Sequence, residues 1–347
     1  MQGNTPHVRA TSAWWWYAAA AAMACAVLLF GYRAHHAHRR LVTDSFQVQQ
    51  NLLALSVQSS LIEHLHEEEK DLRLAVRELV GGGVRDGAVD RVLGNLLASH
   101  IENFLSLALF DDGGRLVRAQ PSVGLWGPVL LGHVRDAILA NAAAGGTFLT
   151  EAFLNAGGET SLGLCVPFRV PGEGGGSYVV VGALRVEDFI RRLYPAWQGR
   201  SVGFVLADDN GRILSLLSTE HLTDGAMKRG NILAPEGECL GCHAAEDFAD
   251  IARSFGKRGV NQSIFRSPKG MTANRATISF EIFNERWALA VISPYESIQL
   301  AIDRNQSMSF ALALLLAATL GAVGWIEGER RRMRAAARES ASVRASE

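Results

Sequence analysis

The sequence is poor in cysteine and has almost no excess of either charge. Only 4 of its 347 residues are cysteine, and 34 lysines and arginines are offset by 35 aspartates and glutamates. A net charge of −1 and 48% apolar residues argue against disorder and against a polyanion-binding surface, so we expect no nucleic-acid partner. The sequence also shows no catalytic triad, no nucleotide-binding loop and no paired carboxylates in a catalytic context. We therefore do not expect an enzyme.

Two of the few cysteines belong to one short motif, Cys-Leu-Gly-Cys-His at residues 239–243. Two thiols separated by two residues can reach the two vinyl groups of one porphyrin, and the adjacent imidazole then lies under the iron. The motif predicts one covalent haem c. Cys239 and Cys242 would form its thioether bonds, and His243 would be the proximal iron ligand.

Other uses of a cysteine pair fit this sequence less well. A zinc site would need a second pair of ligands, whereas the remaining cysteines, Cys25 and Cys165, are isolated in the sequence. A thioredoxin-like dithiol would lie between a strand and a helix, whereas this pair follows residues 234–238, which are typical of a loop. The motif is therefore more typical of a haem c site than of a zinc site or a redox-active dithiol.

Two long apolar segments predict membrane-spanning helices at residues 13–32 and 306–326. A cleaved signal peptide is the alternative for the first segment, because small residues at 22–26 offer a cleavage site. The Trp14-Trp15-Trp16-Tyr17 cluster is typical of an interfacial aromatic belt and favours an uncleaved anchor.

Charge and haem together predict the topology. The arginine-rich tail at 327–347 indicates a cytoplasmic C-terminus, whereas arginines on both sides of the first span leave its orientation ambiguous. The resemblance to cytochromes c implies that haem is attached on the outer side of a bacterial inner membrane. We therefore expect residues 1–12 in the cytoplasm and 33–305 in the periplasm. The tail is either a solvated flank of the second span or a basic segment attracted to anionic membrane lipid.

A long amphipathic helix is predicted for residues 33–80. Apolar residues recur at steps of three, four and seven between Leu41 and Leu79, and glycines at 81–83 end the pattern. The apolar stripe either packs against its own domain or forms a homodimer, and the pattern alone favours neither.

An internal repeat predicts two similar α+β domains, at residues 81–199 and 200–305. Segments 107–117 and 204–214 both predict a hairpin around an Asp-Asp turn with glycine. Segments 178–190 and 287–298 are both typical of a buried strand that continues into a helix.

This order of elements resembles the double Cache (PAS-like) sensor domains of bacterial receptors, over roughly residues 41–326. The resemblance includes the long helix, the two sheet domains, the return span and the pattern Trp-x-Leu-x-Val-x-x-Pro-Tyr-x-x-Ile at 287–298. The chain is similar to the subset with covalent haem c found on chemoreceptors and histidine kinases. About twenty residues follow the second span, too few for a HAMP linker and a kinase. The resemblance then implies a separate cytoplasmic or membrane signalling partner.

The sixth iron ligand is the least determined part of the predicted site. We favour Met227 as the distal ligand, with His221 and Met271 as alternatives in the same domain. Methionine would raise the reduction potential relative to histidine, and an open position would admit a gas. Three histidines on earlier segments remain further options: His64, His66 and His100.

Two function classes follow from these predictions. The first is a membrane-anchored periplasmic haem sensor of redox state or of a gas, which would signal through its second span. The second is a membrane-tethered monohaem cytochrome that transfers electrons to a redox partner. A weaker third option is a Cache receptor for an organic ligand, although residues 111–185 show no clear set of ligand-binding residues.

Overall fold

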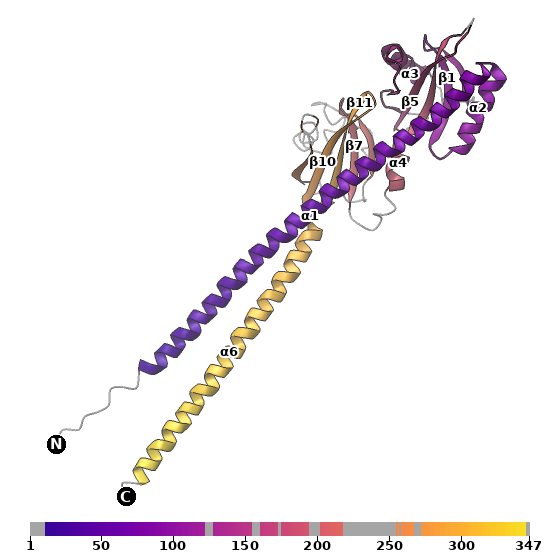
Figure 1. Cartoon of the computed structure of the whole chain (residues 1–347). Helices are drawn as coiled ribbons and strands as arrows, with labels where there is room; N and C mark the ends of the chain where they lie inside the picture. Colours follow the sequence, from indigo (N-terminus) through magenta and orange to yellow (C-terminus); the bar gives the residue numbers. More distant parts are fainter. Residues whose placement is uncertain are drawn as a thin grey trace. The chain divides into compact units, whose positions relative to one another are not determined.

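The computed structural model describes residues 11–121, 128–154, 160–172, 175–193, 202–217, 255, 257, 259–266 and 272–344. The chain divides into two compact units. One contains residues 47–295, with both sheets and most of the core, and the other contains residues 1–46 and 296–347. Figure 1 shows the elements in chain order.

The predicted long helix is present and longer than expected. Helix α1 spans Thr11–Gly82, and Gly83 follows it at φ +75, a conformation that glycine adopts without steric cost. The C-terminal part of its apolar stripe is buried, with Leu65, Leu72 and Leu79 at 0% exposure. Towards the N-terminus of the same helix, Leu41 is 67% exposed. Packing against its own domain is therefore confirmed for the C-terminal part of the stripe.

Sheet A has strand order β2-β1-β6-β5-β3, and β4 pairs with β5 beside this path. All of its pairings are antiparallel. Three helices accompany it: α2 (Asp86–Ser99), α3 (Pro128–Asn141) and α4 (Val186–Leu193), with a short 3₁₀ turn after α3 at Ala142–Ala144. Its strands are β1 (Phe104–Asp111), β2 (Leu116–Gln120), β3 (Phe148–Leu149), β4 (Phe153–Leu154), β5 (Thr160–Arg169) and β6 (Ser177–Arg185).

Sheet B repeats this arrangement with strand order β8-β7-β11-β10-β9. In both sheets an edge hairpin is followed by the last strand of the copy, then by the strand before it. The described residues thus confirm the predicted repeat. The strands are β7 (Gly203–Asp208), β8 (Ile213–Leu217), β9 (Val260–Arg266), β10 (Thr272–Ile282) and β11 (Glu285–Pro294).

The two edge hairpins have equivalent turns. The Asp111 side chain accepts a hydrogen bond from the Arg115 backbone N–H at 2.8 Å, and Asp208 does the same for Arg212 at 2.8 Å. Glycines with positive φ, Gly114 and Gly211, complete the turns. The Asp-Asp-x-Gly signal therefore marks the same backbone structure in both copies.

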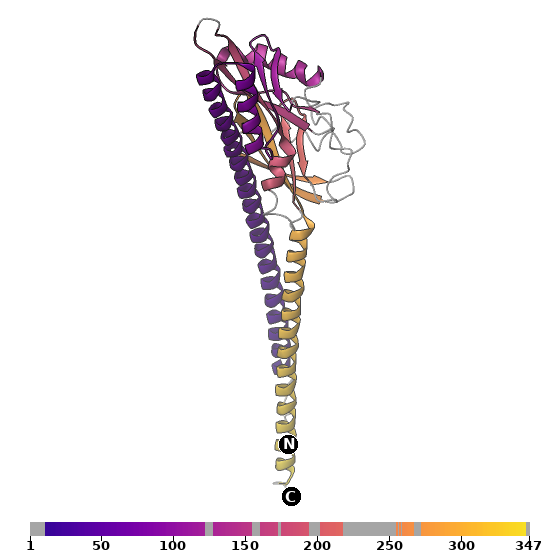
Figure 2. The same ribbon diagram turned by 90° about the vertical axis from the view of Figure 1, so that its right-hand side faces the viewer.

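One core runs along α1 and the facing side of both sheets. It combines α1 residues such as Leu61 and Leu72 with Leu107 of sheet A and Leu206 and Leu289 of sheet B. Figure 2 shows α1 passing along one side of both sheets. We call the side of sheet B that lies away from α1 its outer face.

Polar contacts join β3 of sheet A, and the residues that follow it, to turns of sheet B. The Leu149 backbone N–H donates to Asn284 Oδ1 at 2.7 Å, and Arg212 pairs with Glu151 at 2.7 Å. Burial, followed by the negative charges of Asp209 and Asp208, raises the pKa of the nearby Glu285 to about 7.

Helix α6 (Glu296–Arg344) follows β11 directly, and α4 follows β6, as predicted for the two closing segments. The segments predicted as membrane spans, 13–32 and 306–326, lie within α1 and α6. Among the described residues, no helix combines the length and the apolar character needed to cross a membrane. Both spans therefore remain unconfirmed.

Candidate functional site

The residues predicted to hold the haem lie outside the described residues. The two gaps concerned, 218–254 and 267–271, flank strands β8, β9 and β10, which are described. Sheet B is therefore the described part of the chain that lies next to the predicted haem residues in the sequence. The predicted residues in these gaps are His221, Met227, Cys239, Cys242, His243 and Met271.

Small side chains occupy the centre of the outer face of sheet B. Residues of β10 and β11 alternate between its two faces. Leu289 and Ile278 pair across these strands and face α1, so Ala288 and Ala290 point the other way. Ala207 and Ala290 are both 0% exposed, and Val205 beside them is 1% exposed. The centre of this face therefore carries small, buried apolar side chains on β7 and β11.

Polar side chains border this surface on the β9 and β10 side. Arg275 is 1% exposed, and its Nε donates to Ser263 Oγ at 3.2 Å. Thr277 is 1% exposed and pairs in register with Ala290 and with Asn261. The Thr277 hydroxyl oxygen and the Asn261 amide nitrogen are buried without a hydrogen-bond partner among the described residues. Buried polar atoms normally have a partner, so these two atoms indicate a ligand or further polar contacts.

This outer face could bind a flat apolar molecule that carries an anionic group. Alanines and valine allow close approach over a wide area, and a buried guanidinium is a strong partner for a carboxylate. Ala207, Ala288 and Ala290 belong to neither apolar cluster formed by the described residues, although all three are fully buried. We call this surface, with Arg275 and Thr277 at its polar edge, the alanine platform.

The equivalent face of sheet A is filled differently. Helix α3 places Val134 and Ile138 against Phe110, Phe148 and Cys165. Cys165 is fully buried, as predicted, and burial raises the pKa of its thiol. The described side chains on this face are thus apolar and already packed against a helix.

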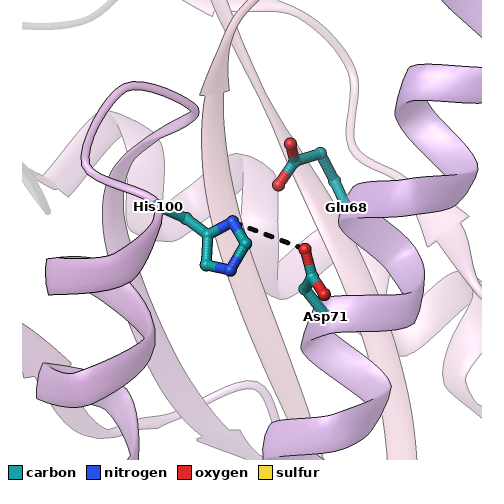
Figure 3. A group of neighbouring side chains, drawn as sticks. All are labelled: Glu68, Asp71 and His100. Atoms are coloured by element: carbon teal, nitrogen blue, oxygen red, sulfur yellow. Dashed lines mark ion pairs between the residues drawn. The ribbon is translucent and has the colours of Figure 1, made fainter.

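A second group of polar side chains lies between α1 and the end of α2. Glu68 and Asp71, three residues apart on one face of α1, point towards His100 at the end of α2 (Figure 3). The ligand atoms of these three residues all lie within 4.8 Å of one another. His100 Nδ1 is 3.4 Å from Asp71 Oδ2.

Glu68 is the most buried member of this group, at 1% exposure. Its Oε1 accepts a hydrogen bond from the Asn103 amide, and the Asn103 oxygen accepts one from Arg192. Burial, followed by the negative charge of Asp71, raises the pKa of Glu68 to about 7, although Asn103 and Arg192 act in the opposite direction.

A cavity of about 480 Å³ adjoins this group, lined by residues 101–105 and by the end of β6 with α4. Arg185, Arg191 and Arg192 give the cavity a positive wall, and Arg185 pairs with Asp188 at 2.8 Å. Asn103 and Arg192 thus line the cavity, and Asn103 also donates a hydrogen bond to Glu68 of α1.

The other two histidines considered as distal ligands lie on α1. His64 Nε2 is 3.7 Å from Glu68 Oε1, and burial lowers the pKa of His64. His66 Nδ1 donates to the Ile62 carbonyl oxygen at 2.8 Å, and the His66 ring lies 5.2 Å from that of Phe283. The structure thus places His64 and His100 around Glu68 rather than beside the alanine platform.

Comparison with known proteins is informative only at the level of structure. No family model matches the chain, and no curated protein matches it. The periplasmic sensory domain of the Campylobacter jejuni chemoreceptor Tlp1 superposes with a TM-score of 0.51 at 14% identity, over 74% of this chain and 98% of that one. The ligand-binding domain of the Pseudomonas fluorescens chemoreceptor CtaA, in complex with L-serine, does so with 0.51 at 16% identity, over 73% and 99%.

The chain has the fold of periplasmic sensory domains. The extracellular domain of a histidine kinase, soHK1S-Z6, extends the comparison beyond chemoreceptors, with a TM-score of 0.50 at 14% identity over 76% of this chain and 99% of that one. The chain also covers 40% of an extracellular ligand binding receptor from Desulfohalobium retbaense. The α+β fold with a long N-terminal helix and two antiparallel sheets, expected from the sequence, is confirmed, and these sensory domains share it. None of these proteins is described as a haem protein, so haem attachment remains a prediction.

Several residues of both candidate sites were not predicted from the sequence. For the alanine platform a signal exists, because Trp287-Ala-Leu-Ala-Val291 alternates large and small residues with the period of a strand. For Glu68, Asp71 and His100 the only signal is the i,i+3 spacing of two carboxylates on a helix, which is common on solvated faces.

Proposed function

We propose that the chain is a membrane-anchored periplasmic sensor with one covalent haem c. Cys239 and Cys242 would carry the haem and His243 would be its proximal ligand, with Met227 as the distal ligand and His221 and Met271 as alternatives. The sensory fold supports a signalling role without catalysis. The motif at 239–243 supports the haem. The two apolar segments at 13–32 and 306–326 support an anchor in a bacterial inner membrane.

The alanine platform is the observation that carries this proposal. The haem motif lies in the connection between β8 and β9, and both strands belong to sheet B. A porphyrin is planar and apolar with two propionate groups, which matches buried alanines beside a buried Arg275. Thr277 offers a buried hydroxyl on the same face. When bound, haem would supply a reversible one-electron change or a position for a gas.

A direct connection leads from the alanine platform to α6. Strand β11 carries Ala288 and Ala290 and ends at Pro294, and α6 begins at Glu296. Between them the Tyr295 backbone N–H donates to the Thr272 carbonyl at 2.8 Å, which ties this junction to the start of β10. We propose that a change at the haem shifts the packing of β10 and β11 and thereby the start of α6.

Further partners belong to the same proposal. Leu41, Val48 and Leu52 of α1 are exposed by 67%, 55% and 61%, and an apolar helix surface of this kind suits a homodimer. The basic tail at 327–347 suits anionic lipid. The signal would pass to a separate output protein.

Replacing Arg275 by methionine tests where the haem lies. A buried positive charge beside the haem would favour the reduced state, which carries one positive charge fewer than the oxidised state. Loss of the Arg275 charge should therefore lower the reduction potential, by on the order of 50 mV. Potentiometric titration of the full-length protein measures this shift.

Arg286→Met is the matched control for this test. Arg286 lies on β11, the strand that pairs with the β10 strand of Arg275, but it pairs with Glu281 at 2.8 Å and its side chain is 48% exposed. Solvent screening should therefore keep the potential within about 10 mV of the parent value. A full complement of haem with an unchanged potential in Arg275→Met would place the haem elsewhere.

A further inference from the structure

We propose that Glu68, Asp71 and His100 bind a divalent transition-metal cation, independently of the haem. The three side chains converge from two helices onto one point (Figure 3). Their ligand atoms all lie within 4.8 Å of one another. In a tetrahedral zinc site with bonds of about 2.0–2.2 Å, neighbouring ligand atoms lie about 3.3–3.6 Å apart. The 3.4 Å between His100 Nδ1 and Asp71 Oδ2 already has that value.

The donor set selects the class of metal. One imidazole nitrogen and two carboxylate oxygens suit zinc and its first-row neighbours, whereas calcium and magnesium prefer oxygen alone and higher coordination numbers. The carboxylates of Glu68 and Asp71, whose ligand oxygens lie within 4.8 Å of each other, also repel each other when both are ionised. A dication would neutralise both charges. Three protein ligands leave a fourth position for water or for another ligand.

An independent observation at Glu68 points to the same site. Glu68 is 1% exposed, and its Oε2 has no hydrogen-bond partner among the described residues. A buried carboxylate oxygen without a partner is costly, and a metal ion is one of the few groups that removes this cost. The other oxygen is held by Asn103, which is held in turn by Arg192. Contacts of this kind orient a carboxylate in metal sites.

A metal at this position would connect α1 to the end of α2. Asp71 and Glu68 belong to α1, and His100 follows α2 and lies four residues before the first residue of β1. The cavity lined by residues 101–105 adjoins the same contact. Metal occupancy would therefore change how firmly α1 is held against sheet A, which gives this region a regulatory input separate from the alanine platform.

Zinc titration of the full-length protein tests the proposal. The protein is first treated with a chelator, and Zn²⁺ binding is then measured in competition with a chromophoric chelator. The background is a variant in which His35, His36 and His38 of α1 are alanine, because these histidines could bind zinc themselves. We expect one site per chain that is saturated at equimolar zinc, and Co²⁺ should give the strong absorption of a tetrahedral site.

Asp71→Asn is the deciding variant, because its side chain is 26% exposed and the change keeps the shape. It should weaken zinc binding more than about tenfold, as should Glu68→Gln and His100→Ala. His133→Ala, which alters a histidine stacked on Phe153, should bind zinc like the parent. Unchanged affinity and stoichiometry in Asp71→Asn, or no zinc bound by the parent at equimolar metal, would overturn the proposal. Covalent haem content should be the same in all of these proteins.

Discussion

Alanine at both Cys239 and Cys242 is expected to abolish covalent haem attachment completely. Each thiol would form one thioether bond, and neither alanine can replace it. The full-length protein is expressed in a host with haem-attachment machinery, and haem is measured by staining after denaturing electrophoresis and by the pyridine haemochrome spectrum. We expect one haem per chain in the parent and none in the double variant.

Cys25→Ser is the matched control for this experiment. Cys25 is an exposed free cysteine on α1, so its loss should leave haem content unchanged. Cys165 is unsuitable as a control because it is fully buried in the core of sheet A. If the double variant kept the same covalent haem as the parent, the haem assignment would be wrong.

Gly182→Ala is expected to reduce the free energy of unfolding by about 3 kcal/mol, the upper end of the usual cost of overpacking. Gly182 lies in the centre of sheet A, where β6 pairs with β1 and β5. A Cβ at this position would lie 2.4 Å from the Phe104 ring. Phe104 is 2% exposed and belongs to the core, so the ring has little space to move. Urea unfolding followed by circular dichroism measures the loss.

The same substitution at Gly94 should have the opposite sign. Gly94 lies in helix α2, where an added Cβ meets no atom within 4 Å. Alanine is a better helix former than glycine by about 1 kcal/mol, so Gly94→Ala should stabilise the protein slightly. Equal unfolding midpoints for Gly182→Ala and Gly94→Ala would contradict the packing described for sheet A.

Those parts of the fold that depend on local chemistry could be predicted from the sequence. The Asp-Asp-x-Gly turns fix both edge hairpins, because an aspartate oxygen and a glycine with positive φ suffice to reverse the chain. The end of α1 at Gly82 follows from the glycines at 81–83 in the same way. The long helix and the repeated order of strands were predicted for related reasons.

Features that depend on tertiary packing could not be predicted in this way. Helix α3 covers sheet A with Val134 and Ile138, but a helix at 128–141 was not expected from the sequence. The alternation in β11 separates a small-residue face from a large-residue face, but it does not show that α1 packs on the large-residue face.

Distance along the chain limited the prediction of the second site. His100 lies 29 residues after Asp71, and only the packing of α2 beside α1 brings the two within 3.4 Å. The sequence led us to consider His100 as an iron ligand, whereas the structure gives it two carboxylate neighbours.

We expect a change at the haem to alter the conformation of α6, the helix that follows sheet B. Hydrogen exchange of the full-length protein, compared between its ferric and ferrous states, measures this change. We predict different exchange rates in β10, in β11 and in the first turns of α6, with unchanged rates in β1 and β6 of sheet A. Identical exchange in the two redox states throughout these segments would contradict the sensor and favour an electron carrier.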